Sequence, residues 1–431
     1  MNQTNYLPYS QSLNSSVSSL FGNEFEKTVG GFNRLPQHIL LKIFSHLKEK
    51  DLHTVQQVCQ RWKQGALNPS LWKNLKIQKL RTTDSVNMAL QKIWMFGQLE
   101  KVYIKDVIEA SALLRQVYRC LPNLKYLIIR YCNNLSAQTM RAVLRKCKQL
   151  EMLDLKGTTF RDNSIFEELP RLPNLRILNL SDNGNLTTKD MIDISLNCRN
   201  LEEFYVSFIK SDSTSKQLTD EDCNFIVSNM SKNLKGFYID GATLTDQCFQ
   251  RIFLCHQLEH LGFHRAYNLT GKTFSVIWQY LTHLKTLKLT FGNQIRDEDV
   301  EVVFLDGRTE MSNLEVIDFT GCWKIKDNAV KAIAESCPKL KKLILKNCKN
   351  ITDVSPLKKC KELAILNIAF CLKLSIDSWL PIQTSVHTIF IDHGDNLKKL
   401  EEDLRQNSRN IDVRLCHSQF KKSFEYYRIH Q

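Results

Sequence analysis

The sequence predicts an α/β solenoid, in which a curved parallel sheet carries helices on its outer side, preceded by a short module of three helices. Two observations lead to this prediction. One apolar pattern, Leu-x-x-Leu-x-Leu, recurs at nearly constant spacing along most of the 431 residues. The segment 32–77 interrupts that pattern with apolar residues at helical spacing.

The repeat is recognised by its first anchor, as in Leu124-Lys-Tyr-Leu127-Ile-Ile129 and Leu150-Glu-Met-Leu153-Asp-Leu155. First anchors lie at 99, 124, 150, 175, 201, 234, 258, 284, 314, 340, 363 and 386, and most steps are 23 to 26 residues long. The two longer steps, 33 and 30 residues, predict insertions after 201 and after 284. An earlier copy begins at Trp72, and a later copy contains Ile411, Val413 and Leu415.

Each unit combines two periods. The alternation of the last two anchors predicts a short strand, and a following segment such as Met140, Val143 and Leu144 predicts a helix packed behind it. One strand and one helix cannot bury their own apolar faces, whereas stacked units can. The repeats therefore predict a leucine-rich-repeat solenoid over residues 78–431.

Polar turns between the predicted strands and helices often read Leu/Ile-Thr-Asp. Examples are Leu218-Thr219-Asp220 and Leu244-Thr245-Asp246. Side-chain oxygens of Thr and Asp can accept hydrogen bonds from the free N–H groups of a helix start. We therefore expect these residues to cap the helices.

Ten of the 14 cysteines keep step with the repeat, at positions 120, 132, 147, 198, 255, 322, 337, 348, 360 and 371. A thiol is a small apolar group that fills tight sites in stacked units. Structural zinc sites need close pairs such as Cys-x-x-Cys, which the sequence lacks. We therefore expect the cysteines to pack in the solenoid, and we expect no metal and no cofactor.

Net charge and targeting signals limit the classes of partner and the compartments that the sequence allows. The net charge of +14 raises the question of nucleic acid, but the basic residues are spread thinly and no nucleic-acid reading motif accompanies them. No apolar run is long enough to span a bilayer, and the ending Arg428-Ile-His-Gln431 is no prenylation motif. Residues 1–30 are rich in Ser and Asn, and we expect them to form a mobile tail. They lack the features of a secretory signal. We therefore expect the protein in a reducing compartment, which is the cytoplasm, the nucleus or both.

The module at residues 31–77 begins with Leu35-Pro36, where a proline suits a helix start. Asp51 is expected to cap its second helix. Three short helices make a meagre core, so the module either seals the end of the solenoid or buries apolar surface against a partner. Periodicity does not separate these two roles.

The residues of this module resemble an F-box along its whole length. The matching features are Leu-Pro, Ile-Leu, Ile-Phe, Asp-Leu, Val-Cys, Trp and a final Leu-Trp at that family's spacings. With the repeats, the chain resembles F-box/leucine-rich-repeat proteins, and the spacing of its cysteines is similar to their cysteine-containing subclass. The resemblance implies the substrate-recognition subunit of an SCF-type ubiquitin ligase, which binds the Skp adaptor, and through it a cullin, and directs a target to degradation. By position, the residues implied to contact the adaptor are Leu35, Pro36, Ile39, Leu40, Ile43 and Phe44.

Repeat arrays bind partners on their concave face. Exposed aromatic residues together with Arg are typical of binding hot spots. Such residues gather between 205 and 291, beside the longest insertion, 207–217. The predicted target-binding residues are Tyr205, Phe208, Tyr238, His260, His264, Arg265, Lys288 and Phe291.

Catalysis by the chain itself is not expected. The sequence has no phosphate-binding glycine loop, no Gly-x-Ser-x-Gly and no His-Glu-x-x-His. Two alternatives remain open: a scaffold that holds the adaptor without delivering a target, and a basic protein that contacts nucleic acid and would show steep salt dependence.

Overall fold

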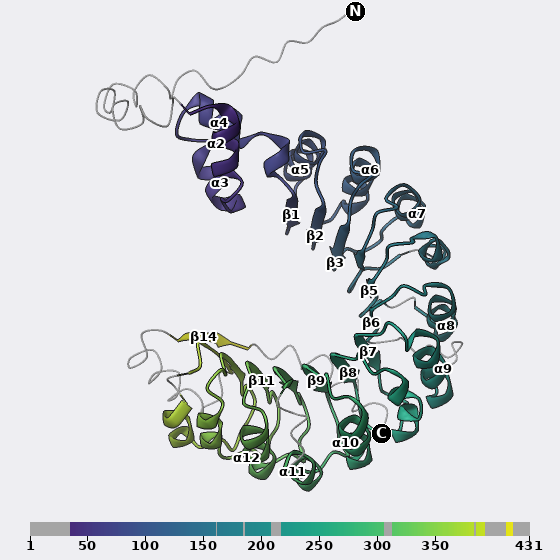
Figure 1. Ribbon diagram of the computed structural model, residues 1–431, viewed down its shortest axis with the longest axis vertical. Coiled ribbons are helices and arrows are strands. Elements are labelled where there is room, and N and C mark those ends of the chain that lie inside the picture. Colours follow the sequence, from purple (N-terminus) through teal and green to yellow (C-terminus); the bar gives the residue numbers. More distant parts are fainter. Residues whose placement is uncertain are drawn as a thin grey trace, which may run out of the picture.

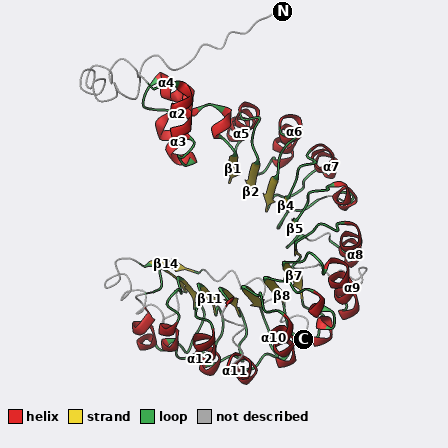
Figure 2. Ribbon diagram, viewed as in Figure 1, coloured by secondary structure: helices red, strands yellow, loops and turns green. Residues whose placement is uncertain are grey.

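The computed structural model describes residues 35–160, 162–183, 186–207, 217–305, 313–382, 385–392 and 411–416. The predicted N-terminal tail and Phe208, with most of the insertion that follows it, lie outside the described residues. The described chain forms an open arc, in which strands line the inner side and helices the outer side (Figures 1 and 2). The predicted α/β solenoid with a helical module in front is confirmed.

The sheet contains fourteen described strands, which pair in parallel in chain order from β1 to β14. They match the twelve anchored copies and the two additional copies at Trp72 and Ile411. The strands are β1 (Asn74–Gln78), β2 (Lys101–Lys105), β3 (Tyr126–Arg130), β4 (Met152–Asp154), β5 (Ile177–Asn179), β6 (Glu203–Tyr205), β7 (Gly236–Asp240), β8 (His260–His264), β9 (Thr286–Leu289), β10 (Val316–Asp318), β11 (Lys342–Ile344), β12 (Ile365–Asn367), β13 (Thr388–Ile391) and β14 (Asp412–Leu415).

Strand register places equivalent anchors beside one another. Leu127 pairs with Leu153, and Ile317 pairs with Leu343. These side chains are fully buried and belong to one core that runs from the front module to β13. The repeat spacing therefore translates directly into a continuous apolar row inside the arc.

The outer layer contains both α-helices and 3-10 helices. The α-helices are α5 (Thr83–Met95), α6 (Ala110–Cys120), α7 (Ala137–Lys146), α8 (Thr188–Asn197), α9 (Asp220–Met230), α10 (Gly271–Tyr280), α11 (Asp297–Leu305) and α12 (Asp327–Ser336). The 3-10 helices are η3 (Phe166–Arg171), η4 (Asp246–Phe249), η5 (Ile252–Leu254), η7 (Ser355–Lys359) and η8 (Ile376–Ile382). Within the described part of the chain, no helix has both the length and the apolar character needed to cross a membrane.

The 3-10 segments correct the expectation of a regular helix in every unit. Two of them contain a proline inside the helix, namely Pro170 in η3 and Pro381 in η8, whereas Pro356 lies at the start of η7. Proline lacks the N–H that a helix interior needs. Two of these units are also short, since the steps from 340 to 363 and from 363 to 386 are 23 residues. A tight 3-10 turn closes such a unit where a longer α-helix does not fit.

The turn that follows most of the described strands uses a left-handed backbone conformation. Tyr131, Arg265 and Phe291, which come just after β3, β8 and β9, have φ of 53°, 56° and 56°. Gly321, after β10, has φ of 75°. The same turn therefore recurs along the arc.

The predicted capping by threonine is confirmed at two turns. The Thr219 hydroxyl accepts from the N–H of Asp222, and the Thr245 hydroxyl accepts from the N–H of Gln247. The role expected for the neighbouring aspartate is wrong at Asp220. Its carboxylate instead accepts from the N–H (2.8 Å) and the hydroxyl (2.7 Å) of Thr245 in the next repeat. This aspartate ties one repeat to the next.

The cysteines pack as expected. The thiols of Cys348 and Cys371 donate to the carbonyls of Phe319 and Leu345 in the preceding repeat, at 3.1 Å each. Burial raises the pKa of the Cys371 thiol to about 12, so it stays protonated and apolar. Within the described residues, no group of three or more His, Cys, Asp or Glu side chains is arranged to hold a metal ion.

The front module consists of α2 (Gln37–Phe44), α3 (Glu49–Val55), α4 (Gln60–Ala66) and the 3-10 turn η2 (Pro69–Leu71). Phe44 packs edge-on against Trp62, with ring centroids 5.6 Å apart, and Gly65 lets α4 approach Phe44 closely. The expected cap at Asp51 is wrong, because α3 begins at Glu49 and Lys48 occupies the cap position. The strand β1 crosses the predicted module boundary at residue 77.

Trp72 fastens the module to the solenoid. Its ring stacks on Phe96 of the first repeat, with centroids 4.7 Å apart, and lies 5.1 Å from the His53 ring of α3. Its indole N–H donates to the carbonyl of Ala66 at 2.7 Å. The side chain is 3% exposed, so the junction between α4 and β1 is part of the common core.

Candidate partner-binding surfaces

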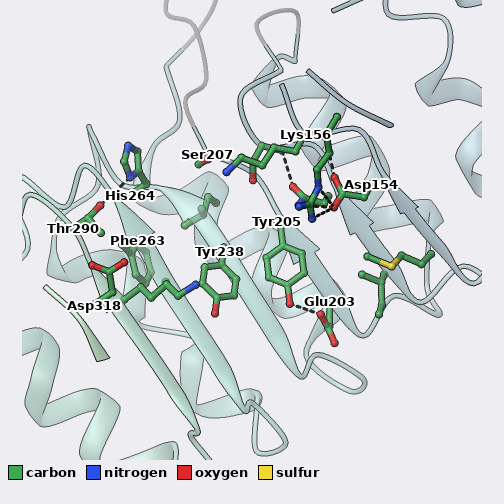
Figure 3. A pocket seen from close by; sticks show the side chains of 18 residues that line it. Asp154, Lys156, Glu203, Tyr205, Ser207, Tyr238, Phe263, His264, Thr290 and Asp318 are labelled. Atoms are coloured by element: carbon green, nitrogen blue, oxygen red, sulfur yellow. Dashed lines mark hydrogen bonds and ion pairs between the residues drawn. The ribbon is translucent and has the colours of Figure 1, made fainter. Parts of the chain in front are cut away.

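A hollow of about 510 Å³ lies on the concave face at the middle of the arc (Figure 3). Side chains from β3 to β10 form it; most belong to strand positions that point away from the buried core, whereas Ile239 and Phe263 are core residues at its base. It is lined by Arg130, Met152, Asp154, Lys156, Ile177, Asn179, Ser181, Glu203, Tyr205, Ser207, Tyr238, Ile239, Gly262, Phe263, His264, Lys288, Thr290 and Asp318.

One end of the hollow holds charges that are satisfied within the chain. The Asp154 carboxylate is fully buried and accepts two hydrogen bonds from the Arg130 guanidinium, at 2.5 and 3.0 Å. It also accepts from the Asn179 amide at 3.3 Å and from the backbone N–H of Lys156 at 3.0 Å. The hydrogen bond and charge of Asp154 raise the pKa of Arg130. A buried charge with this many donors rigidifies the floor of the hollow.

The centre of the hollow is a stack of three side chains. The rings of Tyr205 and Tyr238 lie 4.7 Å apart, and the Lys288 ammonium lies 4.7 Å from the centroid of the Tyr238 ring. Gly262 of the intervening strand makes room for this arrangement, because a Cβ there would lie 2.3 Å from Tyr238 Cδ1. The Tyr205 hydroxyl donates to the Glu203 carboxylate. The result is a flat amphipathic platform across β6 to β9.

Lys288 differs from the paired cations. Within the described residues, no carboxylate lies within ion-pair distance of its ammonium. The ammonium instead makes a cation–π contact with the Tyr238 ring. Asp318 is near enough to favour its charged form, but burial is the larger influence and lowers the pKa of Lys288. The Asp318 carboxylate itself accepts from the N–H and hydroxyl of Thr320, at 3.0 and 2.6 Å.

The two histidines of this region are held neutral. Burial lowers the pKa of His264 to about 4 and lowers the pKa of His260. Their Nδ1 atoms share hydrogen bonds with the hydroxyls of Thr290 (2.8 Å) and Thr286 (3.0 Å), respectively. A ring that is neutral at pH 7 contributes hydrogen bonding and shape rather than charge.

The structure separates the predicted target-binding residues into three groups. Tyr205, Tyr238, His264 and Lys288 line the hollow. The others that the structure describes flank it: His260 lies at the start of β8, Arg265 is paired with Asp240, and Phe291 packs edge-on against His264. Phe208 lies outside the described residues.

Sequence reasoning missed the part of the hollow that β3 to β5 provide. Arg130, Asp154 and Asn179 belong to it, although the candidates were taken only from 205 onward. A signal was present, because Arg130 and Asp154 are opposite charges one repeat apart. Pairing charges between equivalent positions of adjacent repeats would have extended the site.

The second candidate surface is the front module. Of its implied adaptor-contacting residues, Leu40 and Phe44 are buried at 1% and 2% exposure and support α2 from within. Ile43 is 38% exposed and Pro36 is exposed, whereas Leu35 and Ile39 are half-buried. The Leu35 carbonyl accepts a hydrogen bond from Arg61, which holds the start of α2 against α4.

Val58, between α3 and α4, adds a second exposed apolar side chain at 40% exposure, which the implied set did not contain. In the described residues of this module, Ile43 and Val58 are the large apolar side chains that remain most accessible. Both side chains are therefore accessible to a partner.

Comparisons with known proteins match both parts. The F-box-like family model matches residues 32–78, and the leucine-rich-repeat model matches 171–195 and 280–304. F-box/LRR-repeat protein 5 of Mus musculus is 26% identical over 219 residues, and that of Salmo salar is 26% identical over 223 residues. The matches cover 42% and 43% of this chain but only 32% of each relative, so the chain spans about a third of their length. The chain thus combines an F-box-like module with leucine-rich repeats.

Two further similarities are informative. The ubiquitin ligase complex F-box protein UFO1 of Saccharomyces cerevisiae is 45% identical over 49 residues, which is 11% of this chain and 7% of that protein. A chain of the solved yeast Rad7–Elc1 complex has a TM-score of 0.61 and 13% identity, and the match covers 94% of this chain and 98% of that chain. At this identity the likeness concerns the fold.

Proposed function

Because the chain joins an F-box-like module to a leucine-rich-repeat solenoid, we propose that it is the substrate-recognition subunit of an SCF-type ubiquitin ligase. The module binds the Skp adaptor and, through it, a cullin. The concave face holds a target protein and thereby promotes its ubiquitin-dependent degradation. The chain is a receptor and leaves catalysis to other subunits. It acts in the cytoplasm, the nucleus or both, and nucleic acid and membranes are not its partners.

The observation that carries the proposal is that the front module packs on the solenoid and still leaves some apolar side chains exposed. Trp72 fixes the module rigidly to the first repeat, while Ile43 and Val58 stay exposed on it. A module that only sealed the solenoid would turn its apolar side chains toward the repeats. The relative UFO1 is described as an F-box protein of a ubiquitin ligase complex, which agrees with this role.

The test is capture of the adaptor by the purified full-length chain, compared with the variant Ile43→Glu. Ile43 is exposed, so the substitution leaves the packing of Leu40 and Phe44 intact. A buried glutamate at an interface costs several kcal/mol, and each 1.4 kcal/mol weakens binding tenfold, so we expect a loss of about a hundredfold or more. The matched control is Ile108→Glu, at an isoleucine that is 51% exposed in the solenoid. Equal capture by all three proteins would overturn the adaptor-binding role.

Two alternative functions, a solenoid cap and a scaffold, predict different results in these experiments. The stacking of Trp72 on Phe96 favours a module that serves only as a solenoid cap, and that reading predicts no adaptor capture by any variant. A scaffold that holds the adaptor without delivering a target predicts adaptor capture but no ubiquitin transfer. Reconstitution with adaptor, cullin and the ubiquitin-transfer enzymes, using a protein captured through the concave face, separates a receptor from a scaffold.

A further inference from the structure

The concave face carries two kinds of cation. Arg130, Lys156 and Arg265 are paired with the carboxylates of Asp154, Asp182 and Asp240, respectively. Five lysines on the same face have no carboxylate within 4 Å in the described part of the chain; they are Lys76, Lys101, Lys105, Lys288 and, farther along the arc, Lys342. The paired cations form ion pairs within the chain, whereas the ammonium groups without a carboxylate can still pair with an anionic group of another molecule.

Three of these lysines form a band at the end of the arc nearest the front module. Lys76 lies in β1, and Lys101 and Lys105 lie in β2. Strand register sets Lys76 beside Tyr103 and Lys105 beside Arg130. The positions that face the concave side therefore place several cations next to one another.

The carboxylates that flank β2 do not neutralise this lysine band. Glu100 is held by Lys73 and Lys125, at 3.1 and 3.6 Å, and Asp106 is held by Arg81 at 2.7 Å. Asp154, the acidic side chain that faces the concave side in β4, is already bound by Arg130. The band therefore keeps an excess of positive charge.

Aromatic rings hold these ammonium groups over the concave face. The Lys76 ammonium lies 5.6 Å from the centroid of the Tyr103 ring, and the Lys105 ammonium lies 5.5 Å from that of Tyr131. Lys288 lies in the same way over Tyr238. A ring beneath a lysine restricts its motion without cancelling its charge. This reduces the ordering cost of binding an anion.

From this arrangement we infer that the concave face binds an acidic, extended segment of the target protein, which runs from the hollow at Lys288 to the lysine band. The inference rests on the proposed function, because it names the class of target for the same surface. Strands lie about 4.8 Å apart, so β1 and β9 are separated by roughly 40 Å, the length of about twelve extended residues. Aspartate and glutamate side chains of such a segment pair with the lysines.

Single-stranded nucleic acid, which also favours lysine and aromatic side chains, fits this face less well. Between Lys288 and the lysine band the hollow contains the Glu203 carboxylate, and Asp318 of β10 lies on the other side of Lys288; neither forms an ion pair with a lysine or arginine in the described residues. An unbroken chain of phosphates would meet these charges, whereas a polypeptide can place polar or apolar side chains there. Charge complementarity therefore favours an acidic polypeptide.

The experiment measures fluorescence anisotropy of a labelled twelve-residue peptide of alternating Glu and Ser, titrated with the full-length chain. The concave variant is Lys76→Glu/Lys105→Glu, and the matched control is Lys92→Glu/Lys146→Glu, which makes the same change in net charge on exposed sites of α5 and α7. We expect at least tenfold weaker binding for the concave variant, a smaller loss for Lys288→Met, and near-normal binding for the control. Binding should also weaken as salt is raised.

Three outcomes would overturn the inference: equal loss in the control variant, equal binding of a peptide of alternating Gln and Ser, or tighter binding of a twelve-nucleotide oligo-dT that shows the same dependence on Lys76 and Lys105. Adaptor capture is measured on the same preparations. A chain that captures the adaptor but ignores the acidic peptide refutes the acidic-segment inference alone. A chain that binds the peptide but never the adaptor refutes the ligase role alone.

Discussion

The two faces of the sheet follow opposite rules, although they alternate along the same strands. On the buried face, equivalent positions repeat the same kind of side chain, as with Leu153, Leu343 and Leu366. On the concave face, the adjacent positions differ from repeat to repeat, as with Asp154, Gly262 and Lys288. Because successive side chains of a strand point to opposite faces, one face can be uniform while the other varies. The uniform face determines how the units stack, and under the proposed function the varied face determines which target is bound.

The largest expected effect comes from breaking the uniform face. Phe319 is fully buried after β10 and packs edge-on against Phe274, with centroids 6.1 Å apart. Phe319→Ala should lower the free energy of unfolding by about 3–5 kcal/mol, because it removes a large buried side chain and leaves a cavity. Denaturant unfolding measures the total loss, and hydrogen exchange locates it in β10 and β11. A loss below about 1 kcal/mol would show that the buried face tolerates irregularity.

The same contrast explains how far the sequence alone could be interpreted. The spacing of anchors predicts all fourteen strands, since it reports the buried face, where one residue type serves one purpose. The 3-10 segments η3 and η8 were missed because a proline such as Pro170 overrides helical periodicity, whereas η4 and η5 contain no proline and gave no such signal. The concave candidates from 205 to 291 captured the tyrosine stack but not Arg130 and Asp154, because their value depends on pairing across strands rather than on residue type.

An intermediate effect is expected at Gly262, a concave-face position that is itself buried beneath the Tyr238 ring. Gly262→Ala places a Cβ 2.3 Å from Tyr238 Cδ1, so the ring must leave the stack. The free energy of unfolding should fall by about 1–2 kcal/mol, the usual cost of overpacking. In a Tyr238→Ala background the same substitution should cost almost nothing, and this double-mutant cycle isolates the contact.

Gly97→Ala is the matched control for this substitution. The nearest atom to its added Cβ is the Cys120 carbonyl oxygen at 3.9 Å, which is ordinary contact. We expect its stability to change by less than about 0.5 kcal/mol. If Gly262→Ala were equally harmless in the wild-type background, the platform of the hollow would be adaptable rather than fixed.

The smallest effect on stability is expected at Lys288, where binding should still weaken, although less than in Lys76→Glu/Lys105→Glu. Lys288→Met keeps the aliphatic stem on the Tyr238 ring and removes the ammonium. The lost cation–π attraction offsets the relief of burying a charge, so the free energy of unfolding should change by less than about 1 kcal/mol at pH 7. A binding residue is thereby distinguished from a core residue such as Phe319, because its loss weakens target capture but not folding.

The difference in stability between the wild type and Lys288→Met should depend on pH, and its direction tests whether the Lys288 ammonium is unpaired. Burial lowers the pKa of Lys288 below its ordinary 10.5, so the folded protein binds fewer protons than the unfolded chain as this lysine titrates. The wild type should therefore gain stability relative to Lys288→Met as pH rises toward 10.5, because the cost of the buried charge disappears. Denaturant unfolding of both proteins at pH 7 and pH 10 measures this gain. A relative loss of wild-type stability would mean that the ammonium is paired within the chain, and Lys288 would then belong with the paired cations such as Arg130.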